Sequence, residues 1–172
     1  MVVFDATILL LTLDPTTPAP LDPTTGKPVS QPKERVDYLI QNLEEERTKI
    51  IIPTPVLSEI LVRAGKAGPS YLSIIEKSSA FKIEPFDIRA AIEVAHMAGG
   101  AIVTGKKKGP SVQTYAKVKY DRQIVAIGKT LSATVIYTDD KDLKALAETY
   151  GLKVIRISEL PIPPEDPQIT MY

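Results

Sequence analysis

The sequence contains no cysteine and no tryptophan, and its one histidine is His96. The missing thiols exclude disulfides, zinc ribbons and thiolate catalysis, and a single imidazole excludes metal sites built from several histidines. Net charge is absent as well, because 21 Lys and Arg residues balance 21 Asp and Glu residues. Binding to nucleic acid would therefore depend on a local basic patch and not on the field of the whole molecule.

Long hydrophobic runs are also missing. The longest, from Ile8 to Leu13, is interrupted by Thr12 and is far too short to span a bilayer. The N-terminal residues do not resemble a signal peptide, because no positively charged start and no small-residue cleavage site are present. With 44% hydrophobic and 24% charged residues in 172, the composition is that of an ordinary globular protein. We expect one cytoplasmic domain over residues 1–172, with no membrane partner.

Apolar, β-branched runs alternate with amphipathic segments along the chain. Buried strands are predicted at 2–4, 49–53, 81–84, 134–137 and 153–157. Helices are predicted at 6–13, 33–49, 54–65, 69–78, 87–97, 115–132 and 142–150, the fifth of them ending at Gly99 and Gly100. This alternation predicts an α/β fold, a sandwich around a mainly parallel sheet of about five strands.

Proline-rich stretches lie outside these elements. Residues 14–32 hold six of the 15 prolines, and residues 161–167 hold four more. Proline removes a backbone donor and disfavours helix interiors and central strands. We therefore expect a proline-rich arm at 14–32 and a proline-rich tail at 161–172, both outside the core.

Acidic residues fall at the ends of two predicted strands. Asp5 directly follows the first strand, and Asp139 and Asp140 follow the fourth after one threonine. In open α/β sheets, functional groups gather at the carboxyl ends of the strands. Glu59 and Asp121 lie in predicted helices among apolar neighbours. Four acids from four separate elements are thus expected to converge on one pocket.

Such a cluster needs a cation, because carboxylates about 4 Å apart repel by roughly 4 kcal/mol at an effective dielectric of about 20. Oxygen ligands select a hard divalent ion, Mg²⁺ or Mn²⁺. An ion of this kind activates water for phosphodiester hydrolysis, a reaction that requires neither histidine nor cysteine.

Each acid also has an ordinary structural role open to it. Asp5 could cap the N-terminus of a helix, and so could Asp139 or Asp140. Glu59 could be a solvated helix residue, and Asp121 could pair with Lys117 on its own helix. These alternatives remain open from the sequence.

Four segments of the sequence carry a family resemblance when they are taken in order. They are Val-Phe-Asp-Ala-Thr at 3–7, Pro-Thr-Pro-Val-Leu-Ser-Glu-Ile at 53–60, Asp-Arg-Gln-Ile-Val-Ala-Ile-Gly at 121–128 and Val-Ile-Tyr-Thr-Asp-Asp-Lys-Asp-Leu at 135–143. With these motifs the sequence resembles the PIN-domain ribonucleases, especially the VapC-like toxins of toxin–antitoxin pairs. The resemblance implies a three-layer α/β/α sandwich and an Mg²⁺- or Mn²⁺-dependent endoribonuclease. It also implies an RNA substrate, a small antitoxin protein as partner and a homodimer.

The resemblance further implies roles for individual residues. Asp5, Glu59, Asp121 and Asp140 would be the catalytic and metal-binding acids. Asp142 and Asp139 are weaker candidates for metal binding, and Thr7 and Thr138 would support the site by hydrogen bonding.

Basic residues are candidates for contact with RNA. Lys106, Lys107 and Lys108 form the densest basic run, and Arg122 follows Asp121 directly. Lysines of this kind neutralise phosphates in a salt-dependent way, although a solvated loop would have the same composition. Tyr115 and Tyr120 could stack on bases, although packing is the commoner role of a tyrosine.

Two other functions remain open. A PIN-like domain could bind RNA or a protein without cleaving, although the presence of all four acids argues against this. A structure-specific DNA nuclease would use the same acids on a different substrate.

Overall fold

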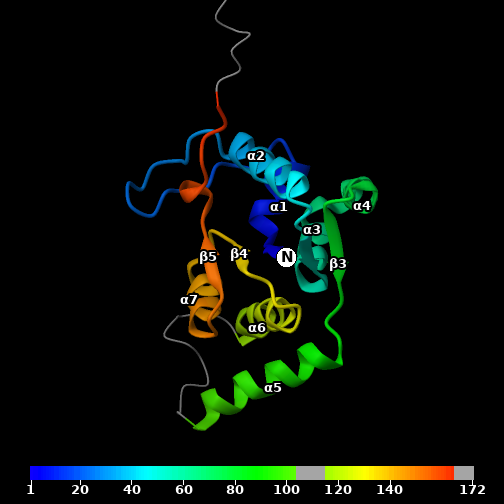
Figure 1. The fold of residues 1–172 in the computed structure, drawn as a ribbon, viewed down its shortest axis with the longest axis vertical. Coiled ribbons are helices and arrows are strands. Elements are labelled where there is room, and N and C mark those ends of the chain that lie inside the picture. Colours follow the sequence, from blue (N-terminus) through cyan, green and yellow to red (C-terminus); the bar gives the residue numbers. More distant parts are fainter. Residues whose placement is uncertain (104–114, 165–172) are drawn as a thin grey trace, which may run out of the picture.

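The structure is a computed structural model that describes residues 1–103 and 115–164. The described strands form one parallel sheet in the order β3-β2-β1-β4-β5, and helices surround it (Figure 1). The strands are β1 (Val2–Phe4), β2 (Ile50–Pro53), β3 (Phe81–Glu84), β4 (Val135–Tyr137) and β5 (Lys153–Ile155). Every residue of β1 and β2 is buried, so both faces of the sheet centre are covered, as in an α/β/α sandwich. The predicted fold class is confirmed.

The helices alternate with the strands along the chain. They are α1 (Ala6–Leu13), α2 (Pro32–Glu45), α3 (Thr54–Ala64), α4 (Gly68–Lys77), α5 (Ile88–Val103), α6 (Tyr115–Thr130) and α7 (Lys141–Thr149), with short 3-10 turns η1 (Gly65–Ala67) and η2 (Ile157–Glu159). Figure 1 shows α5 lying alongside α6 at one end of the molecule. In the described residues no helix is long and apolar enough to cross a membrane.

Two predicted helix ends are wrong. The second helix ends at Glu45 and not at Lys49, because Arg47 takes a left-handed backbone with φ 54° and turns the chain into β2. The helix α5 continues through Gly99 to Val103. A glycine costs about 1 kcal/mol relative to alanine in a helix but does not prevent helical backbone. The glycine pair therefore did not predict the end of this helix correctly.

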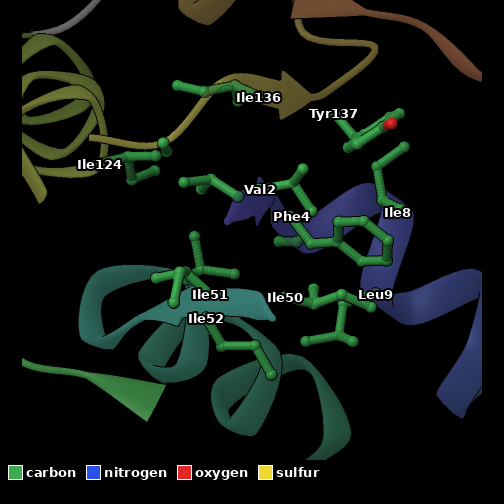
Figure 2. Packing of buried hydrophobic residues seen from close by; sticks show 14 of the residues in the cluster. Val2, Phe4, Ile8, Leu9, Ile50, Ile51, Ile52, Ile124, Ile136 and Tyr137 are labelled. Carbon is green, nitrogen blue, oxygen red and sulfur yellow. The ribbon is translucent and has the colours of Figure 1, made fainter. Parts of the chain in front are cut away.

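The core is centred on β1. Figure 2 shows Phe4 surrounded by Tyr137 of β4, Ile8 and Leu9 of α1 and Ile50 of β2. The Phe4 and Tyr137 rings meet edge to face, with their centroids 5.4 Å apart. Because β1 and β4 pair in register from Val2 to Phe4, the residues that follow each strand also lie side by side.

Helix α6 packs unusually close to the sheet at Gly128. A Cβ atom on this residue would lie 3.3 Å from the Cγ2 atom of Val3, and 3.7 and 3.8 Å from side chains of Leu152 and Ile136. The absent side chain thus lets the helix that carries Asp121 approach the central strand.

Residues 14–31 form no helix, in keeping with their prolines. Leu21 and Pro28 make an isolated antiparallel bridge, and the turn between them is closed by Asp22, whose carboxylate accepts from the backbone N–H groups of Thr24 at 2.7 Å and Thr25 at 3.0 Å. Val29 is buried and joins the core cluster, so the arm is attached to the body of the molecule.

Candidate active site

Asp5 lies at the junction of β1 and α1. Its Oδ1 accepts a hydrogen bond from the backbone N–H of Ile8 at 3.0 Å, which caps α1. Its Oδ2 accepts from the hydroxyl of Thr138. The residue is 5% exposed. Burial raises the pKa of Asp5 to about 7, although both hydrogen bonds oppose the rise.

The corner between β4 and α7 meets Asp5 from the neighbouring strand. Thr138 is fully buried, and besides donating to Asp5 its hydroxyl accepts from the backbone N–H of Asp140 at 3.0 Å. Asp140 caps α7, because its Oδ1 accepts from the N–H groups of Asp142 at 2.8 Å and Leu143 at 3.1 Å. One threonine hydroxyl therefore fixes the positions of two acids.

Lys117 joins two of the acids. Its Nζ lies 3.4 Å from Oδ2 of Asp121, one turn along α6, and 2.5 Å from Oδ2 of Asp140. Burial raises the pKa of Asp121 to about 6, against the charge of Lys117. Burial acts on Asp140 in the same direction, but the hydrogen bonds from Lys117 and from the start of α7 outweigh it and hold the pKa of Asp140 below its ordinary value.

Glu59 is the outermost of the four predicted acids. Its side chain is 47% exposed and pairs with Arg63 on the next turn of α3, with 2.7 Å between Oε1 and the guanidinium. The pair lies at the rim of the pocket.

One pocket of about 520 Å³ brings the four acids together. Besides the acids it is lined by Ala6, Thr7, Pro55, Ser58, Val62, Arg63, Lys117, Tyr120, Ile124 and Leu143. The acids come from β1, α3, α6 and the β4–α7 corner, as expected from their places in the sequence. The pocket therefore combines negative charge with apolar surface.

The four acids line one pocket and also have the structural roles, as helix caps and ion-pair partners, that the sequence left open. Asp5 and Asp140 are both helix caps, Asp121 pairs with Lys117, and Glu59 pairs with Arg63. The cap uses Oδ1 of each acid, whereas Oδ2 of Asp5 accepts from Thr138 and Oδ2 of Asp140 accepts from Lys117. Both residues still line the pocket, so the two roles do not exclude each other.

Other predicted residues lie elsewhere. Asp139 and Asp142 do not line the pocket. Burial raises the pKa of Asp139, against the backbone N–H of Ile157 and the charge of Arg156, so its carboxyl faces η2. Arg122 does not line the pocket either, and its Nε is buried with no hydrogen-bond partner in the described residues. The run from Lys106 to Lys108 lies outside the described residues.

Three pocket residues were missed or underrated from the sequence. The spacing of Lys117 and Asp121 suggested their pairing, but no local signal linked Lys117 to Asp140, which lies 23 residues away. Tyr120 is 52% exposed at the pocket, so it does not take the packing role that is usual for tyrosine. Val62, on α3, is 79% exposed at the same pocket.

The acids fit a hard divalent ion in donor chemistry. All of their donors are oxygens, and Asp5 and Asp121 are buried carboxyls whose pKa values are raised by burial. Among residues 1–103 and 115–164, however, no three acidic or histidine side chains already lie close enough together to hold a metal ion. The positive charge now between Asp121 and Asp140 is the Lys117 ammonium.

Comparison with known proteins was made on sequence and on structure. No family model and no curated protein matches the sequence. Among solved structures, the chain matches a crystal structure of VapBC2 from Rickettsia felis bound to a DNA fragment from the promoter. The TM-score is 0.59 and the sequence identity is 15%, over 91% of this chain and 98% of that one. It matches DNA-bound VapBC from Salmonella typhimurium with TM-score 0.54 and 16% identity, over 91% and 97% of the two chains.

The chain has the PIN-domain fold of the VapC toxins. At these identities the likeness is one of fold, and it confirms at that level the resemblance that the four sequence motifs predicted. In this PIN fold one acid from each of the four motifs lines the same pocket.

Proposed function

We propose that this protein is an Mg²⁺- or Mn²⁺-dependent endoribonuclease that acts as the toxin of a toxin–antitoxin pair. The observation that carries the proposal is the convergence of Asp5, Glu59, Asp121 and Asp140 from four elements on one pocket. The two solved structures compared above are VapBC structures, which supports a small antitoxin as partner. A cytoplasmic location and a homodimer belong to the same proposal.

In this proposal Asp5, Asp121 and Asp140 hold the divalent ion. When bound, the ion supplies Lewis-acid charge and an activated water for phosphodiester hydrolysis. Thr138 orients both Asp5 and the start of α7 through one hydroxyl. Rigid positioning of this kind keeps the carboxylates aimed at the pocket without reorganisation during the reaction.

The rim of the pocket suits a single-stranded RNA. Arg63 offers a guanidinium that can bind a phosphate, and Glu59 holds it in place. Tyr120 and Val62 present exposed apolar surface beside the acids. An aromatic ring at such a place can stack on an unpaired base, whatever the sequence of the RNA.

The proposal is tested by replacing one buried acid at a time. Asp5→Asn and Asp121→Asn should each lower Mn²⁺-dependent cleavage of an RNA pool by at least about 100-fold, because a ligand charge is lost from the metal site. Asparagine has the same shape and also caps helices, so the fold should be kept. Asp37→Asn, on the exposed side of α2, is the matched control. Wild-type cleavage by either pocket variant would contradict the proposal.

The same assay separates the other functions. RNA that is retained on the protein but not cut at any Mn²⁺ concentration would indicate a binding domain. Preferential cutting of flap DNA in competition with single-stranded RNA would indicate a structure-specific DNA nuclease.

A further inference from the structure

The Lys117 ammonium contacts two carboxylates from different elements. Its Nζ is 2.5 Å from Asp140 at the β4–α7 corner and 3.4 Å from Asp121 on α6. The two acid side chains are 32% and 10% exposed, and that of Lys117 is 39% exposed. Asp121 is therefore the more buried of the two acids, and part of the Lys117 side chain is accessible to solvent.

The contacts involve particular oxygens. Oδ1 of Asp140 is occupied by the N–H groups of Asp142 and Leu143, and Oδ2 is the oxygen that Lys117 binds. On Asp121, Lys117 again binds Oδ2. A divalent ion that approached Asp140 from the pocket would need the oxygen at which the ammonium now lies.

Charge balance explains why a cation lies there. Asp5, Asp121 and Asp140 line one pocket, and carboxylates so placed destabilise one another unless a positive group offsets them. Arg63, the other cationic residue that lines the pocket, is paired with Glu59 at the rim.

We infer that Lys117 is a built-in counterion that competes with a divalent ion for Asp121 and Asp140. The ammonium holds the two carboxylates together before the ion binds, and its flexible, part-exposed stem lets it move aside when the ion arrives. Lys117 is a positioning residue in this arrangement and lowers the affinity of the site for metal. The inference rests on the proposed function, because it takes the pocket to be a metal site.

The test is an Mn²⁺ titration of the full chain by calorimetry in the absence of RNA. Lys117→Met should bind Mn²⁺ at least about tenfold more tightly than the wild type, because the competing charge is gone. Lys117→Arg keeps the charge and should bind within about threefold of the wild type. Lys33→Met removes a lysine from an exposed pair with Asp37 on α2 and should change nothing.

A second measurement covers the case in which the uncompensated acids unfold the Lys117→Met variant. Lys117→Gln keeps a polar group at the site, and its Tm should be lower than that of the wild type in chelator and should rise more on addition of Mn²⁺. Tighter binding in the neutral variants, with little change in Lys117→Arg and Lys33→Met, would support the inference.

Two outcomes would overturn it, with different consequences. Equal or weaker Mn²⁺ binding by the neutral Lys117 variants would refute competition and leave the proposed nuclease untouched. No Mn²⁺ binding by any variant, the neutral ones included, would refute both the inference and the metal-dependent function.

Discussion

Asp5 connects a strand, a helix and a pocket through the two oxygens of one carboxyl group. The cap on α1 uses Oδ1 and the bond from Thr138 uses Oδ2. Burial still prevails over these bonds and raises the pKa of Asp5 to about 7. Keeping this residue charged near neutral pH therefore costs folding free energy that a cation in the pocket would offset.

Because of this cost, we expect the free energy of unfolding to depend on pH when no metal is bound. Between pH 4 and pH 7 the folded protein keeps the Asp5 proton, whereas in the unfolded chain the carboxyl loses it around its ordinary pKa of 3.8. The folded state thus binds more protons, and the free energy of unfolding falls as the pH rises through this window. The Asp5 contribution is on the order of 4 kcal/mol, and Asp121, with a pKa of about 6, acts in the same direction.

Comparison with Asp5→Asn isolates the effect. A neutral Asp5 resembles asparagine, so the two proteins should have similar stability at pH 4, and the variant should be the more stable one at pH 8. Urea unfolding in chelator at several pH values measures the difference, with Asp37→Asn as control. A difference that stays constant with pH would show that Asp5 is not held neutral in the folded state.

At the level of single residues, the sequence predicted which acids line a common pocket, but not which side chains contact them. Asp5 and Asp121 were identified because strand ends and apolar helix neighbours are local patterns, whereas Asp140 was preferred to Asp139 only through the family resemblance. The contact between Lys117 and Asp140 was not predicted, because it depends on the side-chain geometry of residues 23 positions apart. The sequence also left open which of the two acids caps α7, and in the structure the cap is Asp140.

Helix α6 contributes both Lys117 and Asp121, and its distance from the sheet depends on Gly128. Replacement by valine adds a branched side chain where even a Cβ would be 3.3 Å from Val3. We expect Gly128→Val to lower the free energy of unfolding by about 1–3 kcal/mol through overpacking. Because Asp121 lies seven residues earlier on the same helix, cleavage of RNA should fall as well.

Gly99 on α5 provides the control for this substitution. A Cβ at Gly99 would meet nothing within 4 Å, and valine has a slightly higher helix propensity than glycine, so Gly99→Val should leave the free energy of unfolding unchanged or raise it slightly. Denaturant unfolding of both variants, beside the cleavage assay, measures the contrast. Equal stability of the two variants would mean that α6 can move away from β1 without loss.

Helices and strands could be predicted where the pattern of burial leaves a simple pattern of apolar residues in the sequence. The runs at β1 and β2 lack polar alternation because both of their faces are covered. Helix ends were less predictable, because the left-handed backbone of Arg47 and the continuation past Gly99 depend on tertiary context. The attachment of the proline-rich arm through Val29 had no signal in the local sequence.

The molecule as a whole has no net charge, so attraction to RNA has to come from local groups. We propose the Lys106–Lys108 run as one of them. Replacing all three lysines by alanine should reduce the slope of log affinity against log salt by about 2, since each phosphate contact contributes about 0.7 for a single strand. Filter binding in chelator at several salt concentrations measures the slope without cleavage.

A second triple variant controls for the loss of charge itself. Lys27, Lys33 and Lys153 are exposed and do not line the pocket, and their replacement removes the same net charge. If both triple variants lower the slope equally, the run at 106–108 has no special part in binding.

The placement of β1 in the middle of the sheet has a consequence for biosynthesis. Its partner β4 is translated long after it, and the hydroxyl that bonds to Asp5 belongs to a residue 133 positions later. A ribosome must therefore have translated the segment that carries Thr138 and Asp140 before the pocket can exist. If the pocket cuts RNA, the nascent chain stays harmless to the message being read until that segment has been made.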